Sequence, residues 1–228
     1  MNLALRSNRL HSFVLRSADL DPQPLLGLLD AEEQQVYRAF RDPSRARDYV
    51  LAHGLKRQVL AALCHRRPQD LRFTHDAHGK PGLAGIGPHF NLSHSQGWVA
   101  LAVSADRHCG IDIESPGTTL ITQALIHSTM SPAEQALIAR AADPQRAFLD
   151  CWVSKEALLK ARGTGLVADL SALCSLNPAP AADGCTETRV HHAHRDYALA
   201  LCARGEPGWM PVIDPPQSVY QLWPLRIR

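Results

Sequence analysis

The chain has 228 residues, of which 45% are hydrophobic and 20% are charged, and its formal net charge at pH 7 is +2. This is the composition of an ordinary globular protein, and so small a net charge argues against a nucleic-acid-binding protein. The sequence contains no apolar run of the roughly 20 residues that cross a membrane, and its cysteines form no C-x-x-C pair. We therefore expect a cytoplasmic protein with buried thiols.

Basic residues outnumber acidic ones in one segment, from Arg38 to Lys80. This segment contains ten arginines and lysines but only four aspartates. A local excess of this kind favours an anionic ligand, although a solvated helix face explains the same pattern. Both interpretations stay open at this point.

The first part of the chain is expected to form a strand and two helices. Residues 3–14 mix apolar and polar side chains in a way compatible with a strand. Asp30 followed by Glu33 predicts a helix start, with a capping acceptor and an acid in the first turn. A longer helix is predicted to begin at Ser44 and to end before Pro68. Its core stripe recurs at helical spacing, at Leu51, Leu55, Val59 and Leu63, and its bases are expected towards the flanks, at Arg47, Lys56 and Arg57.

A loop and two strands are expected next. Gly79-Lys80-Pro81-Gly82 is typical of a tight loop, and the apolar run from Trp98 to Val103 indicates a buried strand. A turn at residues 106–108 then leads into another strand, Gly110-Ile111-Asp112-Ile113-Glu114. We expect the acidic edge of this strand to lie beside Ser93 and His94.

The strand that ends at Glu114 carries a pair of acids. An extended chain points alternate side chains to the same side, so Asp112 and Glu114 share one face. Two neighbouring carboxylates repel each other unless a cation lies between them, and Mg²⁺ prefers oxygen ligands of this kind. An ordinary polar outer face is the alternative interpretation.

Two further helices are predicted in the second half of the chain. Ser131 and Glu134 form a capping-box pattern, and Asp143-Pro144 starts a helix that Gly163 stops. In this second helix Glu156 and Lys155 both lie near the apolar stripe, where burying a charge is costly. One interpretation of Glu156 is a surface ion pair with Lys160, which lies one helical turn later. The alternative is a Glu156 that binds a metal, with Lys155 or Lys160 on phosphate oxygens.

Four blocks of sequence resemble the Sfp-type 4′-phosphopantetheinyl transferases. In chain order they are Gly79-Lys80-Pro81, Phe90-Asn91-Leu92-Ser93-His94-Ser95, Gly110-Ile111-Asp112-Ile113-Glu114, and Trp152-Val153-Ser154-Lys155-Glu156 with Lys160. Each block is short, but their order and spacing match the family. The resemblance implies an α+β fold of two similar α/β halves packed side by side, residues 1–106 and 107–228, with the active-site cleft between them.

The resemblance also implies an activity. It is the Mg²⁺-dependent transfer of the 4′-phosphopantetheine arm of coenzyme A to a serine of an apo carrier protein, with release of 3′,5′-ADP. The carrier would be an acyl, polyketide or peptidyl carrier protein, contacted by residues 118–130. No nucleic acid or membrane takes part, and the enzyme is expected to be a monomer.

Site residues follow from the same resemblance, position by position. Asp112, Glu114 and Glu156 would bind Mg²⁺, and Glu156 would also act as general base towards the carrier serine. Lys160 would contact the diphosphate, with Lys155 nearby. The remaining coenzyme A contacts would come from Gly79, Lys80, Pro81, Ser93, His94 and, at the 3′-phosphate, Arg47, with Arg45 as the alternative.

Two rival functions stay open from the sequence. One is another Mg²⁺-dependent phosphotransfer enzyme or nuclease, since acidic pairs on strands recur there. A nuclease would need aromatic residues among the bases of the segment from Arg38 to Lys80, and these are few. The other is a non-catalytic module that binds coenzyme A or a carrier protein, although binding alone does not require three acids and two lysines.

Overall fold

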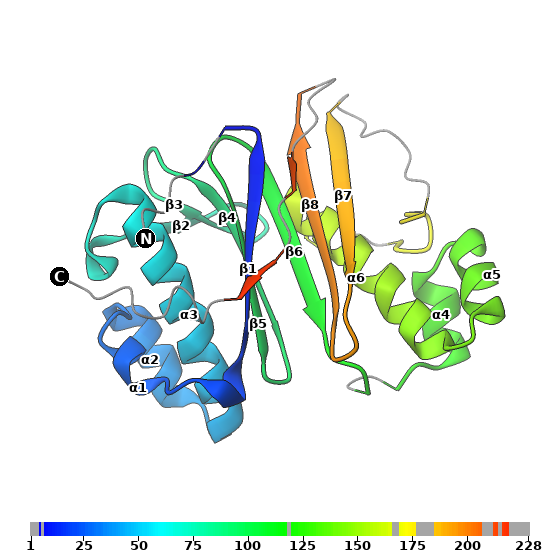
Figure 1. The fold of residues 1–228 in the computed structure, drawn as a ribbon, viewed down its shortest axis with the longest axis horizontal. Coiled ribbons are helices and arrows are strands. Elements are labelled where there is room, and N and C mark those ends of the chain that lie inside the picture. The colour runs from blue at the N-terminus through cyan, green and yellow to red at the C-terminus, as the bar shows by residue number, and fades with distance from the viewer. Residues whose placement is uncertain are drawn as a thin grey trace.

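The computed structural model describes residues 5, 7–117, 120–165, 169–176, 185–206, 212–213 and 216–218. Two sheets lie side by side in the middle of the molecule, and a separate group of helices covers the outer face of each (Figure 1). The result is four layers, helix–sheet–sheet–helix, and the predicted α+β class is confirmed. Among the described helices, none is both long and apolar enough to span a membrane.

The first sheet is built mainly from the N-terminal part of the chain. Its strand order is β10-β1-β5-β4, with β9 also paired to β1, and its central pairs are antiparallel. A separate hairpin, β2-β3, lies beside it. The elements of this group are β1 (Arg9–Arg16), α1 (Gln23–Leu26), α2 (Ala31–Ala39), α3 (Pro43–Cys64), β2 (Phe73–His75), β3 (Pro81–Leu83), β4 (His89–Ser95), β5 (Trp98–Ser104), β9 (Val212–Ile213) and β10 (Gln217–Ser218).

The second sheet has the order β6-β8-β7 and is antiparallel throughout. Its elements and helices are β6 (His108–Glu114), α4 (Gln123–Thr129), α5 (Pro132–Arg140), α6 (Pro144–Arg162), β7 (Thr186–Ala193) and β8 (Ala198–Gly205). The predicted boundary between residues 106 and 107 falls in the turn where the chain passes from β5 to β6. The division of the chain into two halves at this point stays a prediction.

The helix starts of α2, α5 and α6 are confirmed. Asp30 with Glu33, and Ser131 with Glu134, each form both hydrogen bonds of a capping box. Asp143 caps α6, and Gly163 ends it in the left-handed conformation with φ of 72°. Helix α4 has only Thr122 as its cap and was not predicted.

Helix α3 differs from expectation in two ways. Its cap is Asp42, whose side chain accepts the Ser44 N–H at 2.8 Å, so the predicted start at Ser44 is wrong. Lys56 and Arg57 were expected towards the flanks, yet both are buried. Lys56 donates to Glu33 at 2.8 Å and Arg57 donates to the same carboxylate, because this acid on α2 draws both bases into the interface between the helices.

An apolar core fills the space between the two sheets. It combines inward-facing side chains of β1 and β5 with those of β6 and β8, and all of its members are almost fully buried. They are Leu10, Val14, Ala100, Ala102, Cys109, Ile111, Ile113, Tyr197, Leu199, Leu201 and Ala203. This core fixes β6 against the first sheet and leaves its other face for α6.

Gly110 brings α6 into direct contact with β6. A Cβ atom at this position would lie 1.9 Å from the carbonyl oxygen of Ala157 and 2.5 Å from the amide nitrogen of Ala161. The two helix residues are themselves small and buried. The helix backbone therefore lies against the strand backbone, at a distance that only glycine permits.

We expect Gly110→Ala to lower the free energy of unfolding by about 3 kcal/mol or more. Overpacking typically costs about 1–3 kcal/mol, and here the added methyl group meets backbone that cannot rotate away. Urea unfolding measures the loss. Gly27→Ala is the matched control, since nothing lies within 4 Å of its Cβ position and its φ is −69°. Equal stability of the two variants would contradict the close approach.

Candidate active site

Asp112 and Glu114 lie on the face of β6 that is turned towards α6. The alternation of the strand places them on the side of Gly110, whereas Ile111 and Ile113 enter the core between the sheets. The alternation that the sequence predicts is therefore present. It leaves two acids facing a helix that carries a third.

The Asp112 carboxylate is held by one cation and one hydroxyl. It is 4% exposed, and its Oδ1 accepts hydrogen bonds from Ser93 Oγ at 2.8 Å and from Lys160 Nζ at 2.6 Å. Its Oδ2 is buried and has no hydrogen-bond partner among the described residues. A buried acceptor without a partner is costly, so this oxygen is one that a bound cation would satisfy.

Glu114 and Glu156 complete the acidic group. Burial raises the pKa of Glu114, and Asp112 adds to the shift, while the hydrogen bond from Ser95 opposes it. Burial also raises the pKa of Glu156, with contributions from Asp112 and Glu114. Within the described residues the Glu156 carboxylate accepts no hydrogen bond. Asp112 thus disfavours the charge of both glutamates, which is the situation that a divalent cation relieves.

The three acids fit Mg²⁺ by donor chemistry. Mg²⁺ prefers carboxylate oxygens, and Asp112 Oδ2 is a buried oxygen without a partner in the described structure. No three acid, histidine or cysteine side chains in the described ranges already converge at metal-binding distances. In the described structure the Lys160 ammonium contacts the Asp112 carboxylate.

The two lysines of α6 lie in different surroundings. Lys160 lies at the acidic group, where it also donates to Ser93 Oγ at 3.1 Å. Lys155 is 1% exposed and forms a 2.7 Å ion pair with Glu134 of α5. It also donates to the Thr129 carbonyl at 2.6 Å. The expected role of Lys155 near a phosphate is therefore not supported, because its ammonium is buried on another face of the helix.

Arg47 and Arg45 lie in different surroundings. Arg47 donates to the backbone carbonyl of Ser17 at 3.0 Å and to that of Leu20, so its guanidinium supports the turn after β1. Arg45 instead lines a cavity of about 750 Å³ together with His94. Its side chain is 80% exposed and lies 3.8 Å from Asp42. Arg45 is thus the base that a ligand in this cavity would meet.

Ser93 and His94 face opposite sides of β4. Ser93 is buried and contacts Asp112, whereas His94 is exposed in the 750 Å³ cavity, which also contains Asp48 and Tyr49 of α3. The sequence places the two residues side by side, but the strand alternation separates them. One belongs to the acidic group and the other to the cavity over α3.

The loop Gly79–Pro81 lies beside the end of α6. With Glu156 and Lys160 it lines a cavity of about 340 Å³. The Lys80 ammonium points elsewhere, donating to the carbonyls of Cys109 at 3.0 Å and Lys160 at 2.5 Å. These two hydrogen bonds of Lys80 tie the loop to β6 and α6.

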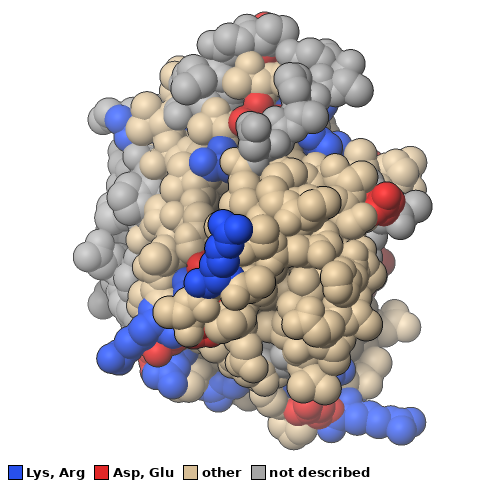
Figure 2. Space-filling model, turned by 90° about the vertical axis from the view of Figure 1, so that its right-hand side faces the viewer, with Lys and Arg blue, Asp and Glu red and all other residues tan. Residues whose placement is uncertain are grey.

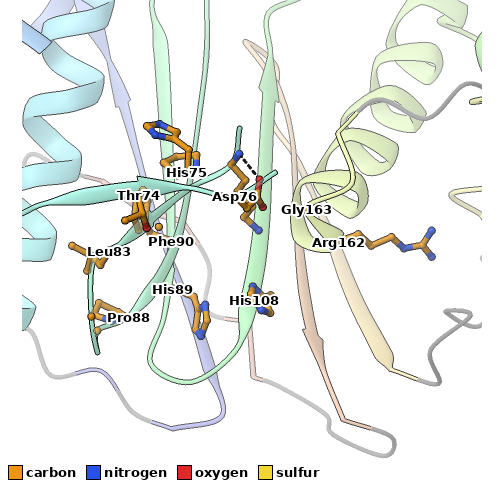
Figure 3. A pocket seen from close by; sticks show the side chains of 15 residues that line it. Thr74, His75, Asp76, Leu83, Pro88, His89, Phe90, His108, Arg162 and Gly163 are labelled. Carbon is orange, nitrogen blue, oxygen red and sulfur yellow. Dashed lines mark hydrogen bonds between the residues drawn. The ribbon is translucent and has the colours of Figure 1, made fainter. Parts of the chain in front are cut away.

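A second cavity, of about 320 Å³, lies next to the same loop. Figure 3 shows Asp76, His89 and His108 around it, with the dashed bond that Asp76 accepts from a backbone N–H of the loop. The rings of His89 and His108 are 4.5 Å apart. Burial lowers the pKa of both imidazoles. The Asp76 carboxylate, which accepts the backbone N–H groups of His78 and Lys80, holds the loop in position.

Ser95 and Asn91 were not predicted as site residues. Ser95 Oγ donates to Glu114 Oε2 at 2.6 Å, and Asn91 Oδ1 accepts the Ile111 N–H at 2.9 Å. The signal was present in the sequence, because Asn91, Ser93 and Ser95 are small polar residues at every second position of the strand.

Comparisons with known proteins identify the family of the chain. A family model described as "4′-phosphopantetheinyl transferase superfamily" matches residues 108–202, the segment that holds β6 and α6. The chain is 30% identical over 222 residues to the 4′-phosphopantetheinyl transferase HetI of Nostoc sp., which covers 92% of this chain and 93% of the relative. The chain belongs to the 4′-phosphopantetheinyl transferase superfamily.

Two Bacillus subtilis proteins extend the comparison. A 4′-phosphopantetheinyl transferase is 29% identical over 193 residues, covering 78% of this chain and 84% of the relative. The 4′-phosphopantetheinyl transferase Sfp is 31% identical over 144 residues, covering 62% and 63%. Phosphopantetheinyl transferases move the phosphopantetheine group of coenzyme A to carrier proteins, so the resemblance found in the sequence is confirmed at the level of family and reaction.

We expect Lys155→Met to destabilise this phosphopantetheinyl transferase without changing its affinity for coenzyme A. Losing one partner of a buried ion pair typically costs about 3–5 kcal/mol, here because Glu134 keeps a charge at 0% side-chain exposure. Urea unfolding and the KM for coenzyme A measure the two effects. The double variant Glu134→Gln/Lys155→Met should recover part of the stability. A raised KM for coenzyme A with unchanged stability would contradict this prediction and indicate that Lys155 contacts the substrate.

Proposed function

We propose that the chain is an Sfp-type enzyme that transfers the 4′-phosphopantetheine arm to a carrier serine in a Mg²⁺-dependent reaction, releasing 3′,5′-ADP. The observation that carries this proposal is the group of three acids with Lys160 beside the Gly79–Pro81 loop. Asp112, Glu114 and Glu156 would hold the ion. When bound, Mg²⁺ supplies positive charge to the diphosphate of coenzyme A and eases departure of the nucleotide.

Lys160 would bind a diphosphate oxygen. Its ammonium already lies 2.6 Å from Asp112 and 3.1 Å from Ser93, so two neighbours aim it at the site. A fixed cation beside a reacting phosphate stabilises the charge that develops as the bond to the leaving group breaks.

Glu156 would accept the proton of the carrier serine, directly or through a water. Ligation of a metal ion would lower the basicity of this carboxylate, so proton transfer through a water fits both roles of Glu156 better than direct transfer. A positioned base typically contributes about 10²–10⁴-fold to such a transfer.

The nucleotide would occupy the space from the Gly79–Pro81 loop to the cavity over α3. Much of the basic excess between residues 38 and 80 is engaged inside the protein, as at Lys56, Arg57 and Lys80. Arg45 and His94 line the 750 Å³ cavity and would meet the 3′-phosphate there. Charged side chains that also donate hydrogen bonds bind phosphate groups such as the 3′-phosphate strongly.

The carrier protein would approach over α4. Residues 118–130 were expected to contact it, and of these residues 118 and 119 lie outside the described residues. Figure 2 shows a broad tan area on this end of the molecule, with Lys and Arg side chains along its left and lower margins. We further propose that the enzyme acts as a cytoplasmic monomer, because a single chain supplies the lining of both cavities.

Incubation with coenzyme A, Mg²⁺ and apo carrier proteins should give each accepted carrier the mass of one added phosphopantetheine group. Mass spectrometry of the intact carrier detects it. We expect Asp112→Ala and Glu156→Ala each to reduce transfer at least 10³-fold, on the order of the loss of a general base or of metal charge stabilisation. Their circular dichroism should match wild type. No mass gain across fatty-acid, polyketide and peptide carriers would refute the proposal, and binding without mass gain would favour a non-catalytic module.

We expect Arg45→Ala to raise the KM for coenzyme A about tenfold or more, since a hydrogen bond to a charged group is worth about 1.5–3 kcal/mol. The KM for 3′-dephospho-coenzyme A should stay unchanged. Steady-state kinetics with both substrates measure this. Arg67→Ala is the control, because Arg67 is exposed and pairs with Asp70 at 2.8 Å outside the cavity. An equal rise of KM for both substrates would contradict a contact with the 3′-phosphate.

A further inference from the structure

Strands β4 and β6 lie next to each other but are not joined by a ladder of backbone hydrogen bonds. β4 is the last strand of the first sheet's β10-β1-β5-β4 path, and β6 is the first strand of the second sheet. The ladders that join strands in the described structure do not include a pair between β4 and β6. Edge strands leave a row of backbone N–H groups that need acceptors when buried. Something else must therefore satisfy the edge of β6.

Side chains of β4 take the place of the missing ladder. Asn91 Oδ1 accepts the N–H of Ile111 at 2.9 Å, and Ser93 Oγ accepts that of Ile113 at 3.4 Å. Ser95 Oγ receives the N–H of Ser115 at 3.5 Å. Each acceptor lies 20 residues before its donor, and this constant offset means that the two strands run in the same direction.

The two serines of this row also bind the acids of the site. Ser93 Oγ donates to Asp112 Oδ1 at 2.8 Å, and Ser95 Oγ donates to Glu114 Oε2 at 2.6 Å. Each hydroxyl thus accepts from the backbone of β6 and donates to a carboxylate of the same strand. Ser93 Oγ also accepts a hydrogen bond from Lys160. In the described structure Ser95 has no such contact with a lysine, and the acid that it contacts is Glu114.

We propose that Ser95 is a positioning residue that orients Glu114 for the metal ion. This inference rests on the proposed function. Glu114 is half-buried beside two other acids, and repulsion favours its rotation towards solvent. The Ser95 hydrogen bond engages Oε2, and Oε1 accepts no hydrogen bond in the described residues, so Oε1 would be the oxygen available to an ion. Hydrogen bonds that orient ligands in this way typically affect metal affinity about 10–100-fold.

The test is Mn²⁺ binding, followed by electron paramagnetic resonance, which counts free ion and requires no transfer. Ser95→Ala should raise the Kd for Mn²⁺ about tenfold or more, and the Mg²⁺ concentration for half-maximal transfer should rise with it. Ser95→Thr keeps the hydroxyl and should bind Mn²⁺ like wild type. Ser104→Ala is the control, because this buried hydroxyl has no hydrogen-bond partner among the described residues. Thermal unfolding confirms that each variant is folded.

The double variant Glu114→Gln/Ser95→Ala separates orientation from general support of the strand. If Ser95 acts through Glu114, it should bind Mn²⁺ no more weakly than Glu114→Gln alone. Wild-type Mn²⁺ affinity in Ser95→Ala, or an equal loss in the Glu114→Gln background, overturns the role of Ser95 even when wild type transfers the arm. Conversely, Ser95-dependent Mn²⁺ binding in a wild-type protein that modifies no carrier supports the positioning role while the proposed function fails.

Discussion

The backbone contact between β6 and α6 at Gly110 is the constraint on which the site depends. A strand and a helix normally stay apart by the length of their side chains, yet here a Cβ would lie 1.9 Å from the Ala157 carbonyl oxygen. Glu156 directly precedes Ala157, and Lys160 directly precedes Ala161, the second contact residue. The approach of α6 to the strand therefore sets how near these two charged side chains come to Asp112. A longer separation would leave Lys160 unable to reach the buried carboxylate at 2.6 Å.

A second constraint joins the two sheets around this contact. The hydroxyl and amide groups of β4 satisfy the edge of β6, and Lys80 ties its loop to carbonyls of both β6 and α6. The acidic group, the loop and the cavity over α3 come from segments far apart in the sequence, and these polar contacts hold them at one place. Because backbone N–H groups as well as acids depend on the same side chains, folding and site geometry are coupled along this edge.

Local signals in the sequence were sufficient to predict several helix starts and the shared face of the two acids on β6. Capping pairs such as Ser131 with Glu134 predict helix starts, and the alternation from Gly110 to Glu114 predicts which acids share a face. The buried partners of Lys155 and Arg47 could not be predicted from local signals. Both are charged residues on helices that carry site residues, and their partners, Glu134 and the carbonyls after β1, are distant in the chain. A buried cation and a ligand-binding cation show the same pattern until their tertiary neighbours are known.

The balance of charge in the site explains why Lys160 is both needed and insufficient. Asp112 raises the cost of ionising Glu114 and Glu156, and burial adds to it, as the raised pKa values of the two glutamates indicate. The Lys160 ammonium donates to Asp112 Oδ1 and to Ser93 Oγ, and the buried Asp112 Oδ2 stays without a partner among the described residues. A diphosphate arriving here would add negative charge and compete for the same ammonium. A further cation beside the three carboxylates would offset this charge, and their oxygen ligands are of the kind that Mg²⁺ prefers, in agreement with the proposed function.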